Sequence, residues 1–298
     1  MKKSPLIRVA GILALGFPGI SMAQNLFEAD SVSGTIYEFT PGGVRSTFAS
    51  VTSATGLAFN SAGNLFVTDP THDNIDEFTP GGTESTFASG VQNPCGLAFD
   101  SAGNLFVADQ IGGNIDEFTP GGAESTFATG LQAPNGLAFD STGNLFVACQ
   151  ATGDANGSIV KITPGGVKSV FVYGLYPLGL VFNSAGILFE SDSFGIFEYT
   201  PGGVQSTLIG TSGLGRSALP YGMTFDGAGN LLVSVQLVNT HPTNDNIDRV
   251  TPGGVESTFA SGLDYPTYLA FQPVPEPSVW LMLGTSVLTL LGFRRKSV

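Results

Sequence analysis

The sequence predicts an all-β fold, a six-bladed β-propeller whose blades each contain four strands. Two observations support this prediction. The tetrapeptide Thr-Pro-Gly-Gly recurs six times, and each copy lies in a repeat of about forty residues that holds four short β-prone segments. A unit of this length with four strands is typical of a propeller blade. The tetrapeptides begin at Thr40, Thr79, Thr119, Thr163, Thr200 and Thr251.

One repeat, GLAFDSAGNLFVADQIGGNIDEFTPGGAESTFATGLQAPN, shows how a blade is built. Its first two expected strands are the apolar segments 96–99 and 105–108, which are separated by the turn-forming sequence Asp-Ser-Ala-Gly-Asn. The third expected strand is 114–118, assigned mainly from its position in the repeat. The fourth is 123–128, where Thr and Phe suit a pleated surface.

The Thr-Pro-Gly-Gly segment between the third and fourth strands predicts a type II turn. Pro at the second turn position fixes φ at about −65°, and Gly at the third position accepts a positive φ. Because these breakers recur in every repeat, no apolar period of about 3.6 residues is long enough for a helix.

The two ends of the repeat region predict how the ring closes. Residues 25–30 match the second strand of a blade but lack a first strand, whereas 266–271 match a first strand with nothing after it. We therefore expect Tyr268–Phe271 to pair with Leu26–Asp30, which leaves only short outer edges exposed. The chain then divides into a leader (1–23), a propeller (24–272) and a tail (273–298).

Three motifs carry a resemblance to a known family. They are Pro-x-Gly-Leu-Ala-Phe-Asp, Gly-Asn-Leu-Phe-Val-Ala-Asp and Asn-Ile-Asp-Glu-Phe. The pattern, over roughly residues 25–271, resembles the NHL-repeat family and the related regucalcin/gluconolactonase and streptogramin-lyase propellers. The resemblance implies the propeller fold. It does not assign an activity, because these families share one architecture among binding and catalytic members.

The leader has the pattern of a secretory signal peptide. Lys2, Lys3 and Arg8 precede the apolar stretch 9–20, and the small-residue segment Ser-Met-Ala ends at Ala23. This order of charged, apolar and small residues predicts cleavage after Ala23. A buried N-terminal strand is the alternative.

The tail combines Pro275-Glu276-Pro277, an uncharged segment at 278–293, and the basic cluster Arg294-Arg295-Lys296. A helix over 278–293 would rise ~24 Å, which is a little less than the ~30 Å hydrocarbon core. Flanking residues could snorkel to make up the difference, with the basic cluster remaining on the cytoplasmic side.

This tripartite tail resembles the PEP-CTERM sorting signal. The resemblance implies an exosortase-type processing enzyme as a partner and a transient inner-membrane anchor through the helix. It also implies export to the cell envelope, outer surface or extracellular matrix of a Gram-negative bacterium, alongside exopolysaccharide production. An ordinary C-terminal membrane anchor is the alternative.

The propeller segment is strongly acidic. Between the leader and the basic cluster the chain keeps all 24 acidic residues but only five basic ones. Nucleic acid is therefore not an expected partner. The charge allows Ca²⁺, basic groups or neutral sugars as ligands, but it equally describes a solvated surface. No cofactor is established by the sequence.

The chain has two cysteines, Cys95 and Cys149, and an even number in an exported protein permits a disulfide. The repeat places both on one face of neighbouring blades, so a bridge is possible. Metal content is not predictable, since no CxxC, HExxH, GxSxG or phosphate-binding loop occurs.

Two sets of positions should surround one mouth of the central channel. Those that end the second strands include four carboxylates, with Cys149 and Val235 in the remaining two blades. These carboxylates could bind Ca²⁺ or accept hydrogen bonds from their own loops. Asn135 and Tyr221 belong to the second set, which precedes the first strands and varies most from blade to blade. The four carboxylates are Asp30, Asp69, Asp109 and Asp192.

Three long insertions should lie on the same face, at 150–158, 209–221 and 236–246. The second contains Arg216 and the third contains His241. Their clustering indicates a binding region, although surface loops also tolerate insertions without function.

The sequence favours a binding or scaffold module over an enzyme. Only His72 and His241 could serve as acid–base groups near neutral pH. Glu28, Asn135 and Asp192 loosely imitate the channel-metal residues of regucalcin-like lactonases, but the surrounding motifs do not match. The expected partner is a polysaccharide or another surface protein. The alternative is a channel-metal hydrolase or lyase.

Overall fold

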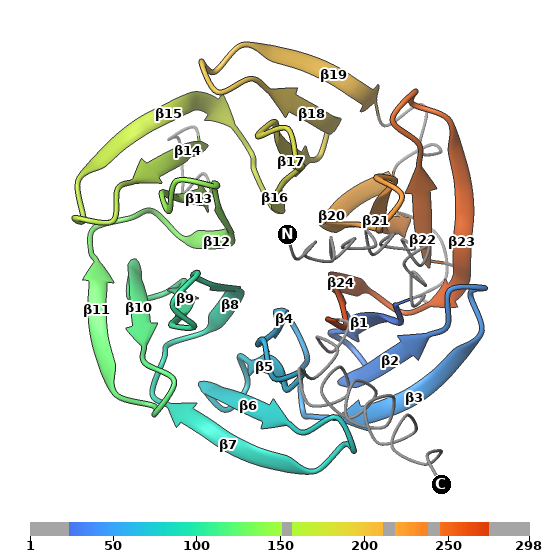
Figure 1. Cartoon of the computed structure of the whole chain (residues 1–298), viewed down its shortest axis with the longest axis horizontal. Coiled ribbons are helices and arrows are strands. Elements are labelled where there is room, and N and C mark those ends of the chain that lie inside the picture. The colour runs from blue at the N-terminus through green and yellow to red at the C-terminus, as the bar shows by residue number, and fades with distance from the viewer. Residues whose placement is uncertain (1–23, 151–156, 211–217, 238–244, 274–298) are drawn as a thin grey trace, which may run out of the picture.

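A computed structural model describes residues 24–150, 157–210, 218–237 and 245–273. These residues form six antiparallel four-stranded sheets arranged in a ring around a central axis, as Figure 1 shows. The prediction of a six-bladed propeller is confirmed. The expected third strand of the quoted repeat also agrees with the structure, where β10 spans Asn114–Phe118.

Each blade is described from the channel outward. Blade 1 consists of β24 (Pro266–Phe271), β1 (Leu26–Asp30), β2 (Thr35–Phe39) and β3 (Arg45–Ser50). Blade 2 consists of β4 (Leu57–Phe59), β5 (Leu65–Asp69), β6 (Asn74–Phe78) and β7 (Glu84–Ser89). Blade 3 consists of β8 (Pro94–Phe99), β9 (Leu105–Asp109), β10 and β11 (Glu124–Ala128).

The remaining three blades follow the same order. Blade 4 consists of β12 (Pro134–Phe139), β13 (Leu145–Cys149), β14 (Gly157–Ile162) and β15 (Lys168–Leu175). Blade 5 consists of β16 (Leu180–Phe182), β17 (Leu188–Asp192), β18 (Gly195–Tyr199) and β19 (Gln205–Gly210). Blade 6 consists of β20 (Ala218–Phe225), β21 (Leu231–Leu237), β22 (Asp245–Val250) and β23 (Glu256–Leu263).

The strand order gives the propeller two distinct faces. The loops that enter each first strand and leave each second strand share one face, which we call the loop face. The opposite face carries the tight turns, two in each of blades 2 to 6 and one in blade 1, where β24 and β1 are not consecutive in the chain. We call it the turn face. This assignment follows from the antiparallel pairing of consecutive strands within each sheet.

The Thr-Pro-Gly-Gly turn differs from the type II turn that the sequence predicts. In the first copy the Gly43 N–H donates to Thr40 O at 2.8 Å, and the positive φ, 80°, lies at Gly43 rather than at Gly42. The Thr40 N–H then donates to Val44 O at 3.0 Å. This is a type I turn followed by a left-handed glycine, which suits a hairpin because its twist matches that of the flanking strands.

The ring closes as the sequence predicts. β24 pairs antiparallel with β1, with Leu26 opposite Phe271 and Glu28 opposite Leu269. The Thr267 Oγ1 atom lies 2.8 Å from Ala29 O and 2.9 Å from Thr55 O. The last strand is therefore fastened both to its own blade and to the next one.

Blades pack on one another through recurring aromatic contacts. The Phe106 and Phe139 rings of blades 3 and 4 meet edge to face with centroids 5.0 Å apart. Phe189 and Phe225 repeat this contact between blades 5 and 6, also at 5.0 Å. Such contacts are worth about 0.5–1.5 kcal/mol beyond the area they bury. They fix the angle between neighbouring sheets.

Inner strands approach one another so closely that glycine is required at their contacts. A Cβ atom at Gly136 would lie 2.3 Å from Leu178 O, and one at Gly56 would lie 2.1 Å from Cys95 O. Gly96, Gly179 and Gly222 stand in the same relation to the following blade. Tyr268 occupies this position in the closing strand.

We expect Gly136→Ala to destabilise the propeller by about 1–3 kcal/mol, because the added methyl group would overlap a backbone carbonyl that cannot rotate away. The matched control is Gly227→Ala on the turn face, where no atom lies within 4 Å of the new Cβ. Denaturant unfolding measures both. Equal stability of the two variants would contradict the close-contact explanation.

Candidate binding site

The four aspartates that end second strands serve their own loops. All four are buried, with exposed fractions between 1% and 6%. Each accepts at least one hydrogen bond from a nearby backbone N–H. The donors are Ser33 N to Asp30 (2.9 Å), Thr71 N to Asp69 (3.0 Å), Gly112 N to Asp109 (2.6 Å) and Phe194 N to Asp192 (2.6 Å). These bonds hold the loops in shape, and in the described part of the chain no cluster of three or more His, Cys, Asp or Glu side chains could hold a metal ion.

Asn135 and Tyr221 meet at the loop-face end of the channel, together with a third residue that the sequence analysis missed. The Asn135 amide donates to Tyr221 Oη at 3.1 Å, and the Tyr268 hydroxyl donates to Asn135 Oδ1 at 2.7 Å. The two tyrosine rings meet edge to face, with centroids 5.6 Å apart. We call these three residues the channel triad.

The channel triad crosses the axis of the propeller. Tyr268 lies in blade 1 and Asn135 in blade 4, on opposite sides of the six-bladed ring, so their hydrogen bond spans the channel. Below it, a cavity of about 280 Å³ is lined mostly by apolar side chains of the inner strands, among them Leu97, Leu137 and Met223. The triad thus separates this apolar cavity from the loop face.

The tyrosines of the triad stay neutral at physiological pH. Burial raises the pKa of Tyr221 to about 12, although the hydrogen bond from Asn135 opposes the shift. Burial also raises the pKa of Tyr268 well above its ordinary value, with Tyr221 and Cys95 adding to the effect. Neutral phenols can donate and accept hydrogen bonds, but they supply no charge for a metal ion.

The three residues that loosely imitate a lactonase metal site have different surroundings in the structure. Glu28 is fully buried, and neither carboxyl oxygen has a hydrogen-bond partner within the described residues. Its counterparts in other blades include Val67 and Val147, which belong to cores between blades. Asp192 binds its own loop and Asn135 binds the two tyrosines. Glu28 is therefore a residue of the packing between blades.

Glu190 repeats the position of Glu28 in blade 5. It too is fully buried, with both oxygens unpartnered among the described residues. Burial raises the pKa of Glu190 to about 9, with a further contribution from Asp192. Burial, followed by Asp30, likewise raises the pKa of Glu28 well above its ordinary value. The Glu190 side chain is therefore protonated at neutral pH.

Cys95 and Cys149 are free thiols in the structure, so the possible disulfide is not formed there. Both are buried in the same apolar cluster between blades 3 and 4. Burial raises the pKa of Cys95 to about 12 and that of Cys149 to about 11. A thiol of this kind is unreactive, because the thiolate is the nucleophile.

Exposed aromatic side chains gather on the loop face. Tyr176 lies between β15 and β16, Phe194 lies between β17 and β18, and their ring centroids are 6.4 Å apart. Tyr173 and Tyr265 are exposed on the same face. The large hydrophobic residues exposed at the turn face are valines, such as Val204. Arg216, His241 and most of the three insertions lie outside the described residues.

Comparison with solved structures confirms the fold. A chain of the nidogen/laminin complex has a TM-score of 0.72 at 20% identity, covering 85% of this chain and 99% of its own. A gluconolactonase from Xanthomonas campestris has a TM-score of 0.62 at 17% identity, covering 74% of this chain and 83% of its own. A streptogramin B lyase has a TM-score of 0.55 at 18% identity, covering 80% of this chain and 73% of its own. Identities this low indicate shared architecture only.

The tail gives the more specific result. Residues 273–296 match the PEP-CTERM protein-sorting motif. The motif indicates a bacterial protein that is exported and undergoes membrane-anchored processing by an exosortase. A search of curated proteins finds no similar sequence.

The expected signal peptide and tail helix lie at 1–23 and 278–293, outside the described residues. Within the part that the structure describes, no helix is long and apolar enough to span a membrane.

The protonated state of Glu190 predicts a pH dependence. The folded protein keeps the proton up to a pKa of about 9, whereas the ordinary value is 4.5, so the folded state binds more protons across this window. Stability from this residue is therefore complete below about pH 4.5 and falls as the pH rises towards 9. Glu190→Gln removes the ionisation, and its stability relative to the wild type should increase over that range.

Urea unfolding at several pH values across the window measures this effect. Glu124→Gln, at an exposed position of β11, is the matched control and should follow the wild type throughout. A constant difference between Glu190→Gln and the wild type at every pH would contradict the assignment.

Proposed function

We propose that this PEP-CTERM protein is a binding or scaffold module of the bacterial envelope or extracellular matrix, and that its loop face holds a polysaccharide or another surface protein. The observation that carries the proposal is the gathering of exposed aromatic side chains on that face, with Tyr176 packed against Phe194. Exposed aromatic patches are typical of interaction sites, since rings supply large contact areas at low entropic cost.

The position of the triad supports binding at the rim of this face rather than inside the channel. The hydrogen bonds among Asn135, Tyr221 and Tyr268 occupy the space in which a ligand would enter from the loop face. One solved relative in fold is a chain of the nidogen/laminin complex, so this architecture occurs in a protein assembly. An acidic surface favours a neutral polysaccharide or a protein partner over an acidic polysaccharide.

A channel-metal hydrolase or lyase is the alternative function. The solved relatives in fold include a gluconolactonase and a streptogramin B lyase. Glu28 lies in the packing between blades and Asp192 binds its own loop, and the described residues contain no cluster of three or more His, Cys, Asp or Glu side chains that could hold a metal ion. Stoichiometric metal in the purified protein, together with lactone hydrolysis that Asp192→Ala abolishes, would favour the enzyme.

We expect the double variant Tyr176→Ala/Phe194→Ala to lose retention in the matrix fraction of cells that export the protein, because its contact surface is gone. Immunoblots of matrix and culture medium measure the distribution. Val204→Ala/Val255→Ala on the turn face is the control and should be retained like the wild type. Retention of both double variants would contradict the proposal. Protease treatment of the matrix beforehand distinguishes a protein partner from a polysaccharide.

A further inference from the structure

The turn face carries grooves between neighbouring blades, and two of them are alike. The groove between blades 3 and 4 encloses about 580 Å³, and the groove between blades 5 and 6 encloses about 520 Å³. Their floors are the edge-to-face pairs Phe106–Phe139 and Phe189–Phe225. Volumes of this size are typical of small-molecule sites.

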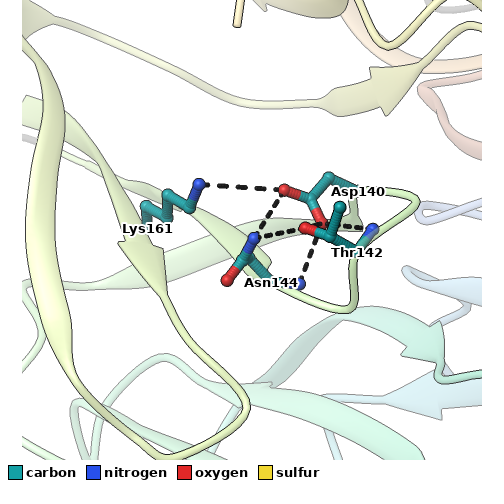
Figure 2. Close-up of polar contacts among 4 residues, drawn as sticks. All are labelled: Asp140, Thr142, Asn144 and Lys161. Carbon is teal, nitrogen blue, oxygen red and sulfur yellow. Dashed lines mark hydrogen bonds and ion pairs between the residues drawn. The ribbon is translucent and has the colours of Figure 1, made fainter.

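Between blades 4 and 5 the corresponding aromatic pair has a cation from the chain itself over one of its rings. Lys161 of β14 places Nζ 5.3 Å from the centroid of the Phe146 ring. Phe146 in turn contacts Phe182 of blade 5 at 5.0 Å, which locates the ammonium group over the groove floor. Lys161 Nζ also lies 3.8 Å from Asp140 Oδ2, as Figure 2 shows.

The carboxylate of Asp140 is held in a fixed orientation beside this cation. Its Oδ1 accepts the backbone N–H groups of Thr142 and Asn144, each at 2.9 Å. Partial burial alone would raise the pKa of Asp140, but hydrogen bonds from Asn144 and Thr142 bring it below the ordinary value. The carboxylate is therefore ionised and fixed in orientation, with Oδ2 directed to Lys161 (Figure 2).

The groove between blades 6 and 1 repeats this arrangement with a guanidinium group. Arg249 of β22 lies 4.9 Å from the centroid of the Phe259 ring, and its Nε lies 3.8 Å from Asp226 Oδ2. This groove, which Arg249 lines, encloses about 230 Å³. Two grooves of the propeller thus contain a cation over an aromatic ring and beside an aspartate, a favourable combination of charges.

In the grooves between blades 3 and 4 and between blades 5 and 6, a glutamate occupies the third-strand position that Lys161 and Arg249 have in blades 4 and 6. Glu117 takes this position in blade 3, and Glu198 takes it in blade 5. Glu117 forms no hydrogen bond or ion pair with the described residues, and Glu198 accepts one bond from Ser206 Oγ at 3.4 Å. Phe106 and Phe189 form their aromatic floors without an internal cation.

In the two other blades that have a glutamate at this position, a side-chain amide binds its carboxylate. Glu38 and Glu77 accept hydrogen bonds from the side-chain amides of Asn25 and Asn64, at 2.6 and 2.7 Å. In blade 3 the corresponding amide, of Asn104, bonds to Asp100 instead, at 3.1 Å. In blade 5 the corresponding residue is Ile187, which has no amide. Glu117 and Glu198 therefore lack the amide partner that Glu38 and Glu77 have, and they line the grooves of about 580 and 520 Å³.

We propose that these two grooves are binding sites for a primary alkylammonium group supplied from outside the chain. In the groove between blades 3 and 4 the ammonium would lie over Phe106 and between the carboxylates of Asp100, Glu117 and Asp140, all of which line it. In the groove between blades 5 and 6, Phe189, Glu198 and Asp226 take the corresponding places. In the groove between blades 3 and 4, Phe106 and Asp100 correspond to the ring and the aspartate that Lys161 contacts in blade 4. In the groove between blades 5 and 6 the residue that corresponds to Asp140 is Asn183, so the negative charge comes from Glu198 and from Asp226 of the next blade.

Calorimetric titration of the full chain in neutral detergent with 1,4-diaminobutane tests the proposal. We expect two equivalents to bind at low ionic strength, and the neutral analogue 1,4-butanediol not to bind. Glu117→Lys supplies the internal cation that blade 4 already has, so it should fill the first groove and reduce the stoichiometry to one. Glu117→Lys combined with Glu198→Lys should abolish binding.

Glu124→Lys is the matched control, because it makes the same change of charge at an exposed position of β11 in the same blade. It should keep both equivalents. Should Glu117→Lys fold poorly, Glu117→Gln removes the carboxylate without filling the groove and should weaken binding at that site at least tenfold.

Unchanged stoichiometry in Glu117→Lys, or equal weakening by Glu124→Lys, would overturn the proposal in favour of diffuse attraction to an acidic surface. A blocked lysine, Nα-acetyl-lysine methylamide, distinguishes the source of the ammonium group. Binding of the diamine and the blocked lysine together indicates that the grooves can take a lysine side chain of a partner protein. Binding of the diamine alone indicates a small free amine.

Discussion

The close approach of inner strands at the channel is the constraint on which the rest of the structure depends. Five glycines face a backbone carbonyl of the following blade at a distance that excludes a Cβ atom. Hydroxyl groups reinforce the contact, since Thr68 Oγ1 donates to Cys95 O at 2.9 Å and Ser191 Oγ donates to Tyr221 O at 2.5 Å. With the inner radius fixed in this way, the aromatic pairs between blades and the grooves outside them recur at equivalent places.

The sixth contact between inner strands differs from the other five, and this difference determines what lies in the channel. Tyr268 stands where the other blades have glycine, and its ring reaches Asn135 on the opposite side of the ring of blades. The strand that closes the propeller therefore also closes its channel on one side. Because the channel triad occupies the centre of the loop face, a partner would contact the rim and the loops of this face. The exposed aromatic residues found there are consistent with this.

The sequence was sufficient for the fold because the repeat encodes it six times over. Strand β10 and the pairing of β24 with β1 agree with expectation, since both depend on local patterns that recur in register. The turn type was wrong because Thr-Pro-Gly-Gly has two glycines, and only the hairpin twist decides which of them takes a positive φ. The departure from glycine at Tyr268 was visible in the sequence and could have identified the third member of the triad.

Contacts between blades were beyond the reach of sequence reasoning. Glu28 and Glu190 resemble surface acids in a chain rich in them, and only the stacking of neighbouring sheets shows that they are buried and that burial raises their pKa values. The free state of Glu117 was equally hidden, because it depends on which partner the Asn104 amide selects. Site residues that depend on a neighbouring copy of the repeat cannot be assigned from one copy alone.

The pairing of β24 with β1 also determines when the protein can fold. Strands more than two hundred residues apart in the chain must meet before blade 1 has its inner strand, as shown by the contact of Thr267 with Ala29. Contacts of such long range slow folding, because the intervening chain must lose conformational entropy before the contacts stabilise the fold. An exported chain emerges in sequence order, so blade 1 lacks its inner strand until the strands of the other five blades have emerged. The sorting motif begins two residues after the closing strand, so the segment that completes the ring is the last part of the propeller to emerge.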